Sequence, residues 1–277
     1  MRIAHLADIH LGPDRKAEAG FRAALERVAA LDVDAIVLGG DTVMNSVNAD
    51  LIRVEAQWAV WHGVRAGIER TPVFPCLGNQ DVWGWNGKAS GCTGEEPLFG
   101  KAMFLRQMGL PRTYYAAKLR SWRLIVLDSV QRGGSHGFVA RLEAPQRAWL
   151  ETELASDPAT STLVVSHVPI VPGPAEFFAA NLLEPEPNGR WSLQSHLVHA
   201  DAHDLTGLFA RFPNVRLCLA GHTHVAQRVE FRGVTYAVSP PVSGAWWRGD
   251  YLGMPRGFAL VDLHADGSFD LSEVVLS

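Results

Sequence analysis

The sequence has few cysteines and no long apolar run. Of its 277 residues only Cys76, Cys92 and Cys218 are cysteines, too few and too widely spaced for a disulfide framework or a thiolate metal site. No stretch reaches the roughly 18 consecutive apolar residues that a membrane-spanning helix requires. The N-terminus also lacks the charged segment followed by an apolar run that marks a secretory signal. We therefore expect a cytoplasmic protein with no membrane segment.

A strong excess of one charge is also missing. Lys plus Arg total 25 and Asp plus Glu total 29, which gives a formal net charge of −4. Such a balance provides no bulk attraction to nucleic acid or to anionic membranes, so nucleic acid is not an expected partner. Hydrophobic residues make up 47% of the chain and charged residues 19%, which excludes a disordered or low-complexity protein. Without an internal repeat or a linker-like tract, we expect one domain over residues 1–277.

The first third of the chain alternates between strand and helix patterns. Apolar runs at 3–7, 35–38 and 72–77 predict strands, and apolar stripes with helical spacing over 21–31 and 51–68 predict the helices between them. Such repetition is typical of parallel strands joined by right-handed crossovers.

The remainder is predicted to be mostly strand. Two dipeptides, Arg232-Gly233 and Asp266-Gly267, are natural hairpin turns, and the segment 82–100, rich in Gly and Trp, predicts a long loop. Helices are expected over 101–108, 145–154 and 201–212, and strands over 112–117, 123–128, 162–166, 215–220, 226–231, 234–238, 258–263 and 268–274. Together the patterns predict an α/β protein with two packed sheets flanked by helices.

Polar side chains that can bind metal follow five of the predicted strands directly. They are Asp8 with His10, Asp41, Asn79, His167, and His222 with His224. Because ligands bind beyond the carboxyl ends of strands in an open parallel sheet, we expect these residues to meet at one edge. Imidazole, carboxylate and amide groups without thiolate suit manganese, iron or zinc. Gly40, Gly78 and Gly221 each precede a candidate ligand and allow the tight turns that such a site requires.

These motifs, taken in order from Asp8 to His224, resemble those of the calcineurin-like metallophosphoesterases. The resemblance implies a four-layer αββα sandwich with two mixed sheets, and two divalent metal ions. Carried over onto this sequence, it implies that Asp41 bridges the two metals. One metal would be held by Asp8, His10, Asp41 and His224, and the other by Asp41, Asn79, His167 and His222. It further implies that a hydroxide bridging the metals hydrolyses a phosphate ester in one step, without a covalent phosphoenzyme.

One position departs from the family pattern. The residue after the motif asparagine is usually His, which assists the leaving oxygen, whereas this chain has Gln80. A glutamine amide donates a hydrogen bond but cannot deliver a proton, and general acid assistance is typically worth about 10²- to 10⁴-fold. We therefore expect weak turnover of esters with poor leaving groups unless His196 or His199 supplies the proton. Asp81, which orients the usual histidine in relatives, loses that partner.

Aromatic and basic residues near the motifs are candidates for contact with the substrate. Trp83 and Trp85 follow Gln80, and Trp246, Trp247 and Arg248 lie beyond the last predicted ligands. These rings either stack on a nucleobase or pack the loops, and Arg248 can pair with phosphate. We take Gln80 and His199 as candidate catalytic residues, and Trp83, Trp247 and Arg248 as candidate substrate-binding residues. The side chains interpreted as structural are His5, His62, His136, His264, Trp58 and Trp61.

The leading functional hypothesis is a two-metal phosphodiesterase that acts on a small molecule such as a cyclic nucleotide. A phosphomonoesterase is a close alternative. Residues 5–12 also resemble the opening of the double-strand-break repair nucleases of this superfamily, but the acidic composition and the 53 residues after His224 disfavour a nuclease. A catalytically silent scaffold, as in the retromer subunit of the superfamily, is disfavoured by the intact set of candidate ligands. The substrate, the metals and the oligomeric state stay open.

Overall fold

A computed structural model describes residues 1–134, 136–173, 183–185, 187–193 and 196–276. Its first sheet has the order β15 (Phe269–Val275), β14 (Gly257–Leu263), β1 (Arg2–Leu6), β2 (Ala35–Leu38) and β3 (Val73–Pro75). The strands β1, β2 and β3 are parallel, while β14 and β15 run antiparallel to their neighbours. The mixed character follows from the helical crossovers of the first third and the hairpin at the C-terminal end of the chain.

The second sheet has the order β12 (Gln227–Phe231), β13 (Val234–Val238), β11 (Val215–Ala220), β8 (Thr162–Ser166), β5 (Trp122–Leu127) and β4 (Tyr115–Leu119). Its four inner strands are parallel, and each edge strand is antiparallel to its neighbour. The turn between β12 and β13 has positive φ at Arg232 (52°) and Gly233 (79°), as a tight hairpin turn requires. Both sheets are therefore mixed: the parallel strands form the centre of the second sheet and one side of the first.

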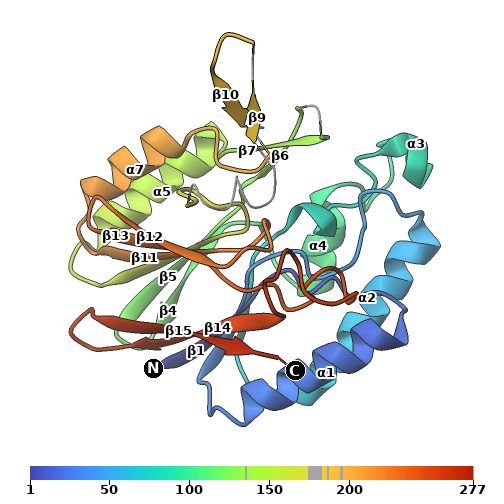
Figure 1. Ribbon diagram of the computed structural model, residues 1–277, viewed down its shortest axis with the longest axis horizontal. Coiled ribbons are helices and arrows are strands. Elements are labelled where there is room, and N and C mark those ends of the chain that lie inside the picture. The colour runs from blue at the N-terminus through green and yellow to red at the C-terminus, as the bar shows by residue number, and fades with distance from the viewer. Residues whose placement is uncertain (135, 174–182, 186, 194–195, 277) are drawn as a thin grey trace.

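Helices cover the outer face of each sheet (Figure 1). The helices α1 (Arg15–Ala29) and α2 (Leu51–Arg65) pack on the first sheet, and α5 (Ala144–Ser156) and α7 (Ala202–Ala210) pack on the second. Asp14 and Asp50 cap α1 and α2, because the side chain of each accepts a hydrogen bond from a backbone N–H of the first turn. A further helix, α4 (Lys101–Met108), lies where the sequence predicts it.

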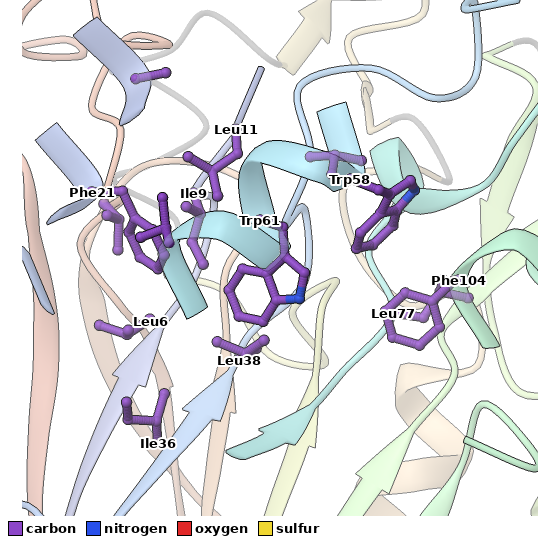
Figure 2. Close-up of a cluster of buried hydrophobic side chains, with 14 of the residues drawn as sticks. Leu6, Ile9, Leu11, Phe21, Ile36, Leu38, Trp58, Trp61, Leu77 and Phe104 are labelled. Carbon is purple, nitrogen blue, oxygen red and sulfur yellow. The ribbon is translucent and has the colours of Figure 1, made fainter. Parts of the chain in front are cut away.

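Three apolar clusters separate the four layers. On β2, Ile36 and Leu38 face the helices while Val37 faces the other sheet, as the twofold periodicity of a strand dictates. Figure 2 shows Trp58 and Trp61 of α2 directed into the helix-side cluster, where the ring of Trp58 lies edge-on to that of Phe104. These layers confirm the predicted αββα sandwich and the core positions of both tryptophans.

The structure also contains short elements that the sequence patterns did not predict. Three-residue strands form two small hairpins, β6 (Val130–Arg132) with β7 (Phe138–Ala140) and β9 (Leu183–Pro185) with β10 (Trp191–Leu193). The predicted loop over 82–100 contains one helical turn, α3 (Gly87–Ser90). Three or four residues are too few to show a period.

None of the described helices is both long enough and apolar enough to cross a membrane. The interpretation of residues 1–277 as one domain stays a prediction.

Candidate metal centre

The seven predicted ligands gather where the parallel strands of the two sheets end. The first sheet supplies Asp8 and His10 after β1, Asp41 after β2 and Asn79 after β3, and the second supplies His167 after β8 and His222 and His224 after β11. Six of these seven residues are buried, and His222 is partly exposed. The arrangement follows the rule that side chains at the carboxyl ends of parallel strands share one edge.

One compact group consists of Asp8, His10 and His224. One potential ligand atom from each lies within 4.8 Å of the others. The Nε2 atoms of His10 and His224 are 3.1 Å apart, and Nε2 of His224 is 3.6 Å from Oδ1 of Asp8. Three donor atoms this close together can share one cation.

A second compact group consists of Asp8, Asp41 and His167, again with ligand atoms within 4.8 Å of one another. Nε2 of His167 lies 3.0 Å from Oδ1 of Asn79. The His222 ring is adjacent, with its centroid 5.0 Å from that of His167, and its Nε2 is buried without a hydrogen-bond partner. A buried nitrogen in this state is suited to a cation as its partner.

Asp41, a member of the second group, also faces the first. Its Oδ1 is 3.4 Å from Nε2 of His167, and its Oδ2 is 3.7 Å from Nε2 of His10. The backbone N–H of Gln80 donates to Oδ1 at 2.7 Å, which fixes the orientation of the carboxylate. A carboxylate that faces one imidazole with each oxygen can serve two neighbouring cations.

The backbone is strained at most of these positions. The φ angles are positive at Asp8 (56°), His10 (50°), Asp41 (54°), His222 (76°) and His224 (60°). Non-glycine residues in this region cost of order 1–3 kcal/mol each and cluster at functional sites. The strain is held by cross-strand bonds, such as Asp8 N–H to the Gly40 carbonyl at 3.1 Å and His10 N–H to the Asp41 carbonyl at 2.9 Å.

The predicted glycines are required here for close packing. A Cβ on Gly78 would lie 2.0 Å from the Asp41 nitrogen, and a Cβ on Gly221 would lie 2.6 Å from Oδ2 of Asp8. At Gly40 the φ angle is also positive, at 93°. The missing side chains therefore let the loops of neighbouring strands approach the ligands.

Hydrogen bonds on the outer side of two imidazoles aim their inner nitrogens at the cluster. Nδ1 of His167 donates to the Gly39 carbonyl at 2.8 Å, and Nδ1 of His224 donates to the Gly244 carbonyl at 2.7 Å. This leaves Nε2 of each ring facing the carboxylates, which is the arrangement that metal-ligating histidines adopt.

The charges in the cluster also fit cations. In the described part of the chain, no Lys or Arg pairs with Asp8 or Asp41, although both carboxyls are buried. Burial lowers the pKa of His10 to about 3, so its ring is neutral. Burial also acts to lower the pKa of His167, but the Asp41 carboxylate raises it to about 9 overall. Buried carboxylates need a compensating positive charge, which the His167 ring gives to Asp41 in this structure and a bound cation would give in its place. The neutral His10 ring offers a lone pair to a metal.

Comparison with known proteins agrees with this geometry. The sequence profile of the calcineurin-like phosphoesterases matches residues 1–226. The chain belongs to this family. It is 25% identical to the 3',5'-cyclic adenosine monophosphate phosphodiesterase CpdA of Haemophilus influenzae over 97% of this chain and 87% of the relative. It is 24% identical to a Synechococcus protein named "Probable cyclic nucleotide phosphodiesterase" over 97% and 90%, respectively.

Solved structures show the same fold. A dimetal phosphatase of Danio rerio aligns with a TM-score of 0.61 at 14% identity, covering 95% of this chain and 93% of that one. A purple acid phosphatase of yellow lupin aligns with a TM-score of 0.63 at 15% identity, covering 99% of this chain and 51% of that one. The fold of this calcineurin-like phosphoesterase is thus confirmed.

Around the ligand cluster, the phosphoesterase places Gln80 in the wall of a cavity of about 490 Å³, together with Asn79, Trp85, His136 and Phe138. The Gln80 Oε1 atom is buried and has no hydrogen-bond partner in the structure. Asp81, next to it, accepts hydrogen bonds from the backbone N–H groups of Gly78 (2.9 Å) and Val43 (3.1 Å). Asp81 therefore ties the loops after β2 and β3 together, a role that needs no histidine partner.

The structure contradicts the assignment of His199 as a proton donor to substrate. Its ring is buried, with Nε2 2.9 Å from Ser166 Oγ and Nδ1 3.0 Å from Asp201 Oδ1. Both nitrogens are engaged within the fold. His196 is closer to the ligands, with its ring centroid 6.4 Å from that of His222 and 3.9 Å from that of His136. His136, interpreted from the sequence as structural, thus belongs to the surroundings of the site.

Two of the tryptophans predicted to contact the substrate are buried instead. The indole N–H of Trp83 donates to the Ala49 carbonyl at 2.9 Å, and that of Trp247 donates to the Ile9 carbonyl at 3.0 Å. Both rings pack loops, so the prediction for Trp83 is wrong. Trp247 also lines a cavity with Trp246 and Arg248, and its contact with substrate stays a prediction. The neighbouring tryptophans Trp85 and Trp246 border the site, and the exposed Trp246 ring lies 4.7 Å from that of His224.

Arg248 is exposed and lines a second cavity, as do Lys16 and Arg53. The sequence analysis did not single out Lys16 or Arg53. Each lies in the first turn of an amphipathic helix, where a charged residue is ordinary, and no motif marks it.

Proposed function

We propose that this phosphoesterase hydrolyses a small-molecule phosphodiester, such as a cyclic nucleotide, with two divalent cations held by the seven clustered residues. The observation that carries the proposal is the presence of two adjacent ligand groups that share Asp8, with Asp41 facing an imidazole of each. The cyclic adenosine monophosphate phosphodiesterase of Haemophilus influenzae, similar over most of both chains, supports the choice of substrate class.

The residues of this chain divide the work. Two cations, when bound, would lower the pKa of a water molecule and neutralise charge on the phosphoryl oxygens. Asp8 and Asp41 supply the negative charge that holds cations, and the Gln80 backbone N–H keeps Asp41 oriented. The Gln80 side-chain amide can donate a hydrogen bond to a substrate oxygen but not a proton. We take His196, rather than His199, as the imidazole that exchanges a proton near the ligands, because its ring centroid lies 6.4 Å from that of His222.

The space around the centre favours a diester over a monoester. One cavity of about 490 Å³ borders Asn79 and Gln80, and another of about 710 Å³ borders Trp246. A diester with two separate arms can place one arm in each cavity, whereas a 3',5'-cyclic nucleotide, whose two ester oxygens belong to one ribose, would place its nucleoside in one of them. A phosphomonoester would leave one of the two cavities without a ligand group.

The test compares bis(p-nitrophenyl) phosphate with p-nitrophenyl phosphate in the presence of manganese, followed by cyclic adenosine monophosphate. We expect a higher kcat/KM for the diester, loss of activity with a chelator, and recovery on adding manganese. Asp41→Asn should abolish activity and metal retention, whereas the exposed Asp32→Asn should change neither. A preference for the monoester would favour a phosphomonoesterase. Absence of bound metal together with inactivity on both esters would favour a scaffold.

A further inference from the structure

A cavity of about 710 Å³ lies beside the candidate metal centre. Its volume is in the range of pockets that hold small molecules. Trp246 lines it, and the same ring lies 4.7 Å from the His224 ring and 5.8 Å from the His10 ring, measured between centroids. Gly12, two residues after His10, lines it as well. The cavity therefore shares a wall with the metal centre, and a group attached to a phosphoryl at that centre can extend into it.

The walls of this cavity carry an excess of positive charge. Lys16, Arg53 and Arg248 line it together with one carboxylate, Asp14. Among the described residues, none of these three cations forms an ion pair or a side-chain hydrogen bond. Asp14 caps α1 by accepting from the Lys16 backbone N–H at 2.8 Å and keeps its negative charge, so the three cations still outnumber the one carboxylate. In a protein of net charge −4, three unpaired cations around one cavity are free to bind an anion.

The cavity of about 490 Å³ that borders Asn79 and Gln80 has a different character, although its lining shares Asn48 with the first. Among the residues that the structure describes, its lining consists of Trp85, Phe138, Asn48 and other uncharged or histidine residues, without Lys, Arg, Asp or Glu. The two arms of a bound diester would therefore meet unlike surroundings: aromatic and amide groups on the Gln80 side, and cations on the Trp246 side.

We propose that the cavity bordered by Lys16, Arg53 and Arg248 binds a second phosphoryl group, carried by one arm of the phosphodiester substrate. The inference rests on the proposed phosphodiesterase function and narrows its substrate class. A 3',5'-cyclic nucleotide has one phosphoryl group, which the metal centre would take, and brings no anion to these cations. A diester with a phosphorylated arm brings one phosphoryl group to the metal centre and a second to the cations of the cavity.

The chemistry of the side chains suits phosphate. A guanidinium offers a planar pair of donors that matches two phosphate oxygens, and an ammonium adds a compact charge. Arg53 and Arg248 are exposed in this structure, so solvent screens them. For charge-assisted contacts at such a site we expect a gain of about ten-fold in kcat/KM from the second phosphoryl group.

The experiment uses two matched substrates, thymidine 5'-(p-nitrophenyl phosphate) and the same ester with a 3'-phosphate. They share the scissile bond and the leaving group, so the ratio of their kcat/KM values isolates the added phosphoryl group. With manganese present, we expect the wild-type ratio to be about ten and the Lys16→Gln/Arg53→Gln ratio to fall close to one. Arg65→Gln, an exposed arginine at the other end of α2, is the matched control and should keep the wild-type ratio.

A wild-type ratio close to one would overturn the inference, and so would a ratio that the double variant leaves unchanged. If the wild type cleaves neither ester, the proposed function fails. A binding measurement then tests separately whether the cavity takes a phosphate group. Calorimetry would compare thymidine 3',5'-bisphosphate with thymidine 5'-monophosphate. Tighter binding of the bisphosphate that is lost in the double variant supports the cavity as a phosphate site, and equal binding of the two nucleotides overturns it.

Discussion

Replacing Gly78 by alanine tests whether the loops after β2 and β3 must touch for the centre to form. The added Cβ would lie 2.0 Å from the Asp41 nitrogen and 2.2 Å from its Oδ1, whereas real Cβ atoms keep at least 3.0 Å. Asp41 must therefore retreat by about 1 Å, while metal–ligand distances tolerate only about 0.2 Å. Because Gly78 has φ −100°, alanine adopts its backbone freely, and the effect comes from the clash alone.

We expect Gly78→Ala to weaken manganese binding by at least about ten-fold, and to cost about 1–3 kcal/mol of folding free energy, as overpacking does. Calorimetric titration with manganese measures the first quantity, and urea denaturation measures the second. Gly63→Ala is the matched control, since a Cβ there meets no atom within 4 Å. In the helix it should raise stability by about 0.5–1 kcal/mol and leave manganese binding unchanged. Wild-type manganese affinity in a folded Gly78→Ala protein would refute the reasoning.

Three further predictions concern the surroundings of the centre and the core. Gln80→His should raise turnover of an alkyl phosphodiester by about 10²-fold and change that of a p-nitrophenyl ester little, and equal effects on both in steady-state assays would contradict this role. Trp61→Ala, at a fully buried position, should lower the free energy of unfolding by about 3–5 kcal/mol, whereas an unchanged urea midpoint would contradict it. Burial acts to raise the pKa of Asp201, but the hydrogen bond from His199 lowers it overall. A carboxyl with a lowered folded-state pKa stabilises the fold only while it is ionised. Asp201→Asn should therefore lower the free energy of unfolding by about 1–2 kcal/mol at pH 7. Measured by urea denaturation, this loss should become smaller as the pH falls below about 4. A loss that stays constant with pH would show that the charge is irrelevant.

The layers of the fold and the position of the ligand cluster were predictable because both follow from regular repetition. Continuous apolar runs mark β1, β2, β8 and β11, and parallel strands bring their carboxyl ends to one edge. A polar residue directly after such a strand therefore lies at this shared edge, as Asp8 and His167 do.

The walls of the cavities beside the metal centre were not predictable in the same way, because they are built from irregular turns. Trp246 and Trp247 are adjacent and both have positive φ (51° and 66°), yet one ring is exposed and the other is buried. No period distinguishes neighbours in such a segment, so the sequence could not show which of the two rings is exposed. His199 was misassigned for a related reason, since its partners Ser166 and Asp201 come together only through the packing of α7 on the second sheet.

The ligand set is divided between two sheets that pack through apolar side chains such as Val37 and Leu217 and through hydrogen bonds such as that from His167 Nδ1 to the Gly39 carbonyl. Each compact ligand group takes donors from both sheets, so neither sheet alone forms a site for a cation. A cation with ligands from both sheets links the two sheets, and its binding free energy adds to the free energy of folding. The affinity with which a purified sample retains metal therefore also reports how well the two sheets pack against each other, even at positions far from the metal centre.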